Sequence, residues 1–441
     1  AMDTPEKLGT PQKALLINLD ATVFGSFAEI GAGQEVARWF LRVGGASGTV
    51  AKTISAYDKE VSDDLYGAGT RYVSKPRLQA MLDSEWEQLL GQLQATRGAT
   101  TKFFAFVDTI SARNFSGTND CHGWVGLRFL QQPGGPANDV ILHVNLRDPS
   151  NVQQQETVGI LGVNLLYAAQ QDLKSPGEFL AGVLEELSLE RLELDCMELK
   201  GPAFETWDRD ELHALLVMGG HTEAVAFPAD NNFVPSSELI YKRALVLAPG
   251  RFGNIEQLHA DLIRVTLAEL PPEELKESKG GLGLFCLSVA PGGAELATLP
   301  VAEIIKTVKE LQKMGYGVML FRAPELYMMS AFLNRYTQLR IHFSVGLSVL
   351  VWVLGDRYKN LPGHLLEGIA RLFSQNVRLV VHPMTAEDVE RRVKEAALTG
   401  WSWNETNGMV YADDLHPAKP LEYLYKYLLS EFWILPSKAA R

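Results

Sequence analysis

The runs FFAFVDTI (103–110), GWVGLRF (123–129) and VILHVNL (140–146) decide the fold of the first half of the chain. Each run is short and rich in aromatic or β-branched residues, a composition typical of strands. The last two are joined by residues 133–139, where proline, glycine and asparagine gather as they do in turns. We therefore predict an antiparallel meander.

Helical patterns surround these strands. We expect helices near 34–41, 78–94, 153–169, 176–187 and 210–218, and further strands near 191–195, 224 and 239–247. The segment Ala14–Asp20 is a short apolar run that ends in an acid, which predicts a strand buried on both faces of a sheet. Residues 1–270 are therefore predicted to form a mixed α/β N-terminal domain.

A different pattern begins after residue 270. Residues at about 271–283 concentrate proline, glycine and charge, and we interpret them as a linker between domains. Beyond them, strand and helix patterns alternate regularly as far as His382. This alternation predicts a C-terminal βα domain over 284–441, with a parallel sheet covered by helices on both faces.

Composition excludes several classes of protein. Of 441 residues, 46% are hydrophobic, which is enough for substantial cores, and the net charge of −12 argues against binding to nucleic acid or an anionic membrane. The three cysteines form no CxxC pair, so neither a disulfide framework nor a zinc-cysteine site is indicated. We recognise neither a signal peptide nor an apolar run of about 20 residues. These features predict a cytoplasmic protein.

The clearest candidate binding site lies between Glu29 and Glu35. Gly31 and Gly33 would let the backbone approach a ligand, and the free amides where a helix begins near Gln34 would attract an anion. The spacing resembles the first motif of Rossmann methyltransferases, acid-x-Gly-x-Gly, but Glu35 replaces the third glycine and would repel a phosphate. The competing interpretation is a glycine turn that reverses the chain.

A second motif precedes this turn. Asn18-Leu19-Asp20 resembles the first motif of haloacid-dehalogenase-like phosphatases. Asn18 occupies the position of the nucleophile, and a neutral amide cannot form an aspartyl-phosphate. The resemblance therefore implies no phosphatase activity. Asp20 is retained as an acid expected close to the glycine pair.

Two histidines fall on or beside neighbouring predicted strands. His122 and His143 could approach one another within about 5 Å on one face, with Asp108 on a third strand. No HExxH or HxH spacing ties them into a metal site. We therefore expect histidines that are hydrogen-bonded or exposed, and no bound metal.

Five segments together resemble a bacterial family of uncharacterised cytosolic proteins. They are Phe27–Phe40, Gln153–Asn164, Glu238–Arg243, Asn334–Thr337 and Leu361–Gly368. Members of that family carry the labels nicotinate or nicotinamide nucleotide adenylyltransferase and TonB-dependent receptor. Neither label fits the residues, because no HxGH element follows a first strand and the many amphipathic strands of a receptor are missing. The resemblance brings no catalytic residue with it.

The leading hypothesis is a protein that binds an anionic small molecule, such as a nucleotide or a phosphorylated metabolite. Its expected ligand-binding residues are Asp20, Glu29, Gly31, Gly33 and Gln34. The alternative is a non-catalytic homo-oligomeric assembly or regulatory protein. Neither a catalytic residue nor a cofactor is indicated, so the sequence assigns no reaction.

Overall fold

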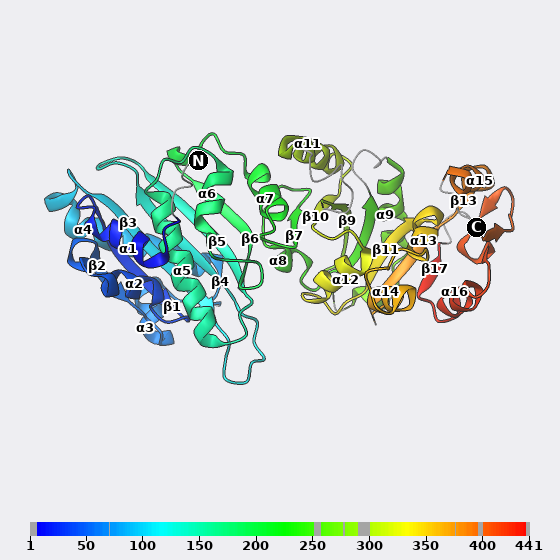
Figure 1. Cartoon of the computed structure of the whole chain (residues 1–441), viewed down its shortest axis with the longest axis horizontal. Helices are drawn as coiled ribbons and strands as arrows, with labels where there is room; N and C mark the ends of the chain where they lie inside the picture. Colours follow the sequence, from blue (N-terminus) through cyan, green and yellow to red (C-terminus); the bar gives the residue numbers. More distant parts are fainter. Residues whose placement is uncertain are drawn as a thin grey trace, which may run out of the picture. The chain divides into compact units, whose positions relative to one another are not determined.

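A computed structural model describes residues 7–69, 71–250, 257–276, 278–289, 300–374, 376–395 and 400–437. The chain divides into two compact units, residues 1–222 and 223–441. Figure 1 shows the elements in chain order. Each unit is described by itself below.

Unit 1 is built on a six-stranded mixed sheet with the order β2-β1-β3-β4-β5-β6. Its strands are β1 (Val23–Ile30), β2 (Val50–Ile54), β3 (Lys102–Ser111), β4 (His122–Leu130), β5 (Ala137–Leu146) and β6 (Leu192–Lys200). Strand β1 runs parallel to β2 and β3, whereas β3, β4, β5 and β6 pair antiparallel. The predicted antiparallel meander is confirmed.

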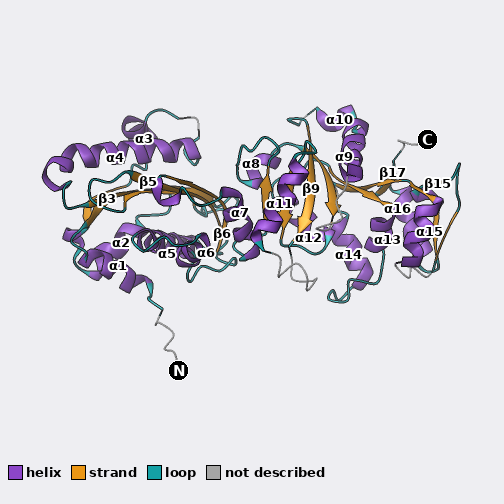
Figure 2. Cartoon of the chain, turned by 90° about the horizontal axis from the view of Figure 1, so that it is seen from above, coloured by secondary structure: helices purple, strands orange, loops and turns teal. Residues whose placement is uncertain are grey.

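Helices cover both faces of this sheet (Figure 2). One face carries α1 (Thr10–Leu19), α2 (Glu35–Val43), α5 (Asn151–Ala169) and α6 (Pro176–Val183), and the other carries α3 (Lys59–Tyr66) and α4 (Lys75–Arg97). Helix α7 (Arg209–Met218) packs against β6, and short 3-10 turns occur at Ala46–Gly48 and Pro202–Phe204. Phe27 and Phe106 fill the core on the first side, while Leu78 and Trp124 belong to the core beneath α4.

The segment predicted as the first strand is instead helix α1. Within this helix Ala14 and Ile17 are buried, whereas Leu16 and Leu19 are 47% and 68% exposed. A short apolar run is compatible with either a strand or a helix, and Pro11 in the first turn favours the helix. The first strand begins only at Val23.

Unit 2 contains a seven-stranded sheet with the order β17-β12-β11-β8-β9-β10-β7. Its strands are β7 (Ala224–Phe227), β8 (Ala244–Gly250), β9 (Gly281–Ser288), β10 (Gly317–Phe321), β11 (Ile341–Gly346), β12 (Val377–His382) and β17 (Ile434–Pro436). All neighbours pair in parallel except β7, which lies antiparallel to β10 at one edge.

Helices also cover both faces of this second sheet. In Figure 2, α9 (Gln257–Glu269) and α10 (Pro272–Leu275) lie on one side, and α12 (Leu326–Asn334), α13 (Leu347–Val353) and α14 (His364–Leu372) on the other. The other helices are α8 (Ser236–Ile240), α11 (Val301–Gln312), α15 (Ala386–Glu395) and α16 (Leu421–Ser430), with a 3-10 turn at Ala412–Asp414. Two small antiparallel sheets pair β13 (Met384–Thr385) with β15 (Met409–Val410) and β14 (Trp401–Trp403) with β16 (Leu415–Pro417). The fold class is α/β, as predicted.

The division between the units lies earlier in the chain than the predicted linker. Strand β8 belongs to the second sheet, where Ala244 pairs with Gly281 of β9. The segment 271–283 therefore connects elements of unit 2, with residue 277 outside the described residues. Its prolines lie at the start of α10, and its glycines lie at the start of β9. Over the described residues, no helix is long and apolar enough to cross a membrane.

Candidate functional site

The glycine turn follows the carboxyl end of β1 and leads into α2. Gly31 has a φ of +102°, and a Cβ atom there would lie 1.7 Å from the carbonyl oxygen of Ile110. Gly31 is therefore required by the close approach of the turn to the end of β3. Gly33 also has a positive φ, +73°, but it is exposed and a Cβ atom would meet only ordinary contacts.

Glu29 accepts hydrogen bonds from amides at the start of α2, where an external anion was expected to bind. Its Oε1 accepts a hydrogen bond from the amide of Val36 at 2.9 Å, and its Oε2 accepts one from Ala37 at 3.0 Å. The side chain is buried, with 1% of its surface exposed. Burial raises the pKa of Glu29 to about 7, although the two hydrogen bonds favour the ionised form. The start of α2 is thus capped from within the protein.

A second buried acid lies beside Glu29. Asp108 is its register partner on β3, and its Oδ1 accepts a hydrogen bond from the amide of Ile30 at 3.1 Å. Its Oδ2 is buried and has no hydrogen-bond partner among the described residues. Burial, followed by the charge of Glu29, raises the pKa of Asp108 well above its usual range. Two like acids in this position disfavour the entry of an anion.

Asp20 lies at the opposite end of β1 and is separated from Gly31 by the whole strand, roughly 25 Å of extended chain. Its Oδ1 accepts hydrogen bonds from the amide of Thr22 at 2.9 Å and from the Thr22 hydroxyl at 2.6 Å. Lys102 forms an ion pair with it at 3.5 Å. Asp20 therefore stabilises the turn before β1, and the expectation that it lies close to the glycine pair is wrong.

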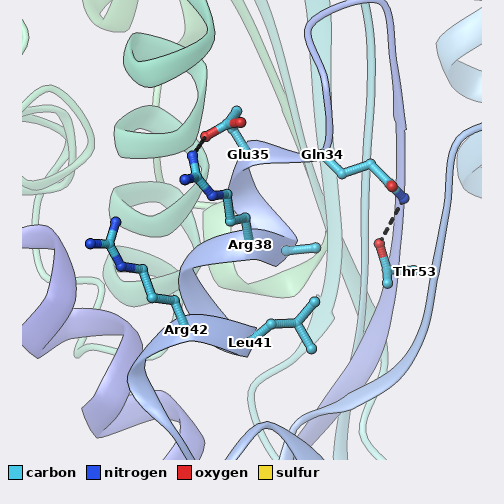
Figure 3. A pocket seen from close by; sticks show the side chains of 7 residues that line it. Gln34, Glu35, Arg38, Leu41, Arg42 and Thr53 are labelled. Carbon is cyan, nitrogen blue, oxygen red and sulfur yellow. Dashed lines mark hydrogen bonds and ion pairs between the residues drawn. The ribbon is translucent and has the colours of Figure 1, made fainter.

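An open hollow of about 550 Å³ lies along the outer side of α2. It is lined by Gln34, Glu35, Ala37, Arg38, Leu41, Arg42 and Thr53 (Figure 3). Gln34 donates a hydrogen bond to the Thr53 hydroxyl at 3.0 Å, which links the start of α2 to β2. Of the residues predicted for ligand binding, Gln34 alone lines this hollow.

Two arginines supply positive charge to the hollow. Arg38 is 62% exposed and forms an ion pair with Glu35 at 3.1 Å, while the guanidinium of Arg42 lies 5.7 Å from the Trp39 ring. Figure 3 shows both side chains extending from the same side of α2, with Leu41 apart from them. The sequence-based prediction missed this pair, although the spacing of four residues places two side chains on one helix face.

The histidine prediction is confirmed in part. Nδ1 of His122 lies 3.1 Å from Nε2 of His143, so the two cross-strand neighbours do meet. The acid beside them is Asp195 on β6, whose Oδ1 lies 2.6 Å from Nδ1 of His143. Asp108 lies two residues after Phe106 on β3 and therefore faces the same side of the sheet, which α2 covers. His143 lies two residues after Ile141 on β5 and faces the opposite side, beneath α4. No metal-binding cluster occurs among the described residues.

Comparison with known proteins gives structural neighbours for a part of the chain. No family model matches, and no curated protein matches. The competence/damage-inducible protein CihA of Agrobacterium tumefaciens is similar over 37% of this chain and 99% of its own, with 20% identity and a TM-score of 0.29. A competence-damaged (CinA) superfamily protein of Enterobacter cloacae is similar over 39% and 98%, with 12% identity and a TM-score of 0.29. A competence or damage-inducible protein of Enterobacter asburiae covers 37% and 100%, with 13% identity and a TM-score of 0.27.

Proposed function

We propose that this protein binds an anionic small molecule, such as a nucleotide or a phosphorylated metabolite, in the hollow along α2. The observation that carries the proposal is the pair Arg38 and Arg42 on one side of that hollow. Arginine presents several N–H donors in a planar fork, which matches the oxygens of phosphate and carboxylate groups. Gln34 and Thr53 add an amide and a hydroxyl at the β2 side.

The charges within the hollow favour Arg42 as the stronger contact. Arg38 is already paired with Glu35, whereas no ion pair of Arg42 occurs in the described parts of the chain. The apolar side chain of Leu41, which is 54% exposed, supplies a surface for an uncharged part of the ligand. A nucleoside or sugar attached to the anionic group fits this mixture of surfaces.

Binding is tested with inorganic pyrophosphate, adenosine monophosphate and a sugar phosphate. The midpoint temperature of thermal unfolding of the full chain should rise with at least one of these probes, because a ligand that binds the native state stabilises that state. Titration calorimetry should then show that Arg42→Gln weakens binding by tenfold or more, since a hydrogen bond to a charged group contributes about 1.5–3 kcal/mol.

Arg264→Gln is the matched control. Arg264 on α9 is 66% exposed and pairs with an acid three residues away, as Arg38 does, but it lies in unit 2. This variant should bind like the original protein. Absence of a thermal shift with all three probes, or equal affinities of the Arg42 and Arg264 variants, would contradict the proposal.

A second candidate function is homo-oligomeric assembly. It is favoured by the outer face of α1, where Leu15, Leu16 and Leu19 are 37%, 47% and 68% exposed. Light scattering over a dilution series should then show a discrete oligomer that Leu16→Ser and Leu19→Ser convert to monomer. A monomer at all concentrations would exclude this function.

A further inference from the structure

A hydrogen-bonded chain of three titratable side chains runs across β4, β5 and β6 in unit 1. Nδ1 of His122 lies 3.1 Å from Nε2 of His143, and Nδ1 of His143 lies 2.6 Å from Oδ1 of Asp195. The side chains of His143 and Asp195 are 3% and 4% exposed. Asn145 donates from Nδ2 to Oδ2 of Asp195 at 2.9 Å and to Glu193 at 3.2 Å. Asn145 therefore holds the Asp195 carboxylate beside His143, and we call the chain of His122, His143 and Asp195 the relay.

When both imidazole rings are neutral, hydrogen-bond chemistry determines where each proton lies. A carboxylate only accepts hydrogen bonds, so Nδ1 of His143 carries the proton directed at Asp195. Neutral His143 then has its lone pair on Nε2, and it must accept from Nδ1 of His122. Neutral His122 is left with an unprotonated Nε2.

This nitrogen is available to a ligand. His122 is partly exposed, and its Nε2 has neither a hydrogen-bond partner nor a buried position within the described residues. The titratable groups whose charges act on the ring are His143, Asp120, Asp195 and Arg71. Burial, and then the His143 ring, lower the pKa of His122, so the imidazole is neutral and able to accept a proton near neutral pH.

We propose that Nε2 of His122 is a proton-accepting site for a hydroxyl group or water molecule bound at this end of the sheet. In that step the O–H bond breaks, the proton bonds to Nε2, and the electron pair stays on the oxygen. The resulting imidazolium donates through His143 toward Asp195, whose carboxylate stabilises the positive charge. His143 and Asp195 are positioning residues. This site lies on the α4 face of the sheet, so it is independent of the hollow along α2.

The tautomer of His122 gives the first test. In the full chain labelled with ¹⁵N at histidine only, long-range ¹H–¹⁵N spectra should show neutral His122 protonated at Nδ1. Free histidine prefers the Nε2–H form, so the relay must impose this state. A neutral His122 protonated at Nε2 would overturn the proposal without requiring any variant.

Asp195→Asn gives the second test, because it should reverse both tautomers. Asn145 donates to the Oδ2 side of residue 195, so the new amide oxygen will face Asn145 and its NH₂ group will face Nδ1 of His143. His143 then carries its proton on Nε2 and donates to Nδ1 of His122, which moves the His122 proton to Nε2. The proton-accepting atom is lost while the hydrogen bonds are kept.

Diethyl pyrocarbonate, which acylates unprotonated imidazole nitrogens, reports this loss by mass spectrometry of the modified peptides. Asp195→Asn should slow modification of His122 at least tenfold, with exposed His364 as an internal reference. Asp172→Asn removes the same charge at a residue that is 78% exposed and should leave the rate unchanged. A His122 rate in the Asp195 variant equal to that of the original protein would refute the proposal.

Discussion

Gly31 is required by the backbone geometry of its turn. Its φ is positive, and a Cβ atom at this position would lie 1.7 Å from the carbonyl oxygen of Ile110. Both features exclude a side chain here. We expect Gly31→Ala to lower the free energy of unfolding by at least about 2 kcal/mol more than Gly44→Ala, which shares a positive φ but has open space around it. Urea unfolding checks this, and equal losses would show that the contact with Ile110 relaxes at little cost.

Removing the charge of Glu35 should strengthen anion binding, whereas Arg42→Gln should weaken it. Its carboxylate pairs with Arg38 at the edge of the hollow and repels an incoming anion. We expect Glu35→Gln to strengthen binding of the phosphate probe by about threefold, the effect of one partly exposed charge pair. Calorimetry at one ionic strength measures the change, and weaker binding would place the ligand elsewhere.

At the scale of the element, Glu29 ties helix α2 to strand β1. Its pKa is about 7 in the native protein against 4.5 for an unperturbed glutamate, so the native state holds a proton that the unfolded chain has released. The stabilisation is present below about pH 4.5 and is lost as the pH rises toward 7. The pKa of Asp108 is also raised, by burial and then by the charge of Glu29, so its ionisation lowers the stability in the same direction as the pH rises.

Glu29→Gln should therefore flatten the decline in unfolding free energy between pH 4.5 and 7, because the amide cannot ionise. Unfolding by urea at several pH values measures the slope. Glu178→Gln, at an exposed position in the first turn of α6, is the control and should keep the original slope. Identical slopes in all three proteins would mean that Glu29 ionises normally in the native state.

At the scale of the whole molecule, the place where the chain divides has a direct consequence. Unit 1 ends with Thr222, whose hydroxyl donates to the buried Glu193 at 3.2 Å. Residues 1–222 should therefore fold alone and unfold cooperatively. A fragment of residues 1–270, the domain expected from the sequence, would carry β7 and β8 without their partners β9, β10 and β11.

We expect the fragment 1–270 to aggregate, because Leu245, Val246 and Leu247 are fully buried in the complete sheet and would become exposed. Size-exclusion chromatography of both fragments, with circular dichroism, checks this outcome. A monomeric 1–270 fragment together with an unfolded 1–222 fragment would contradict a domain boundary at residue 222 and favour one near residue 270.

The sequence determined the elements whose pattern is local. The meander of β3, β4 and β5, the parallel βα arrangement of unit 2 and five helices of unit 1 follow from period, turn residues and alternation, which act over a few residues. These helices are α2, α4, α5, α6 and α7. The segment at Ala14–Asp20 was assigned wrongly because an apolar run of seven residues fits a strand or a helix equally well.

Only the tertiary structure decided which side chains meet. Glu29 reaches the amides of α2 seven and eight residues later, and Asp195 completes the relay of His122 and His143 from 52 residues beyond His143. Strand order and register bring such groups together, and a single sequence carries no local signal for either. For the same reason, the glycine pair indicated a binding turn, while the side chain that fills its amides became evident only in the folded chain.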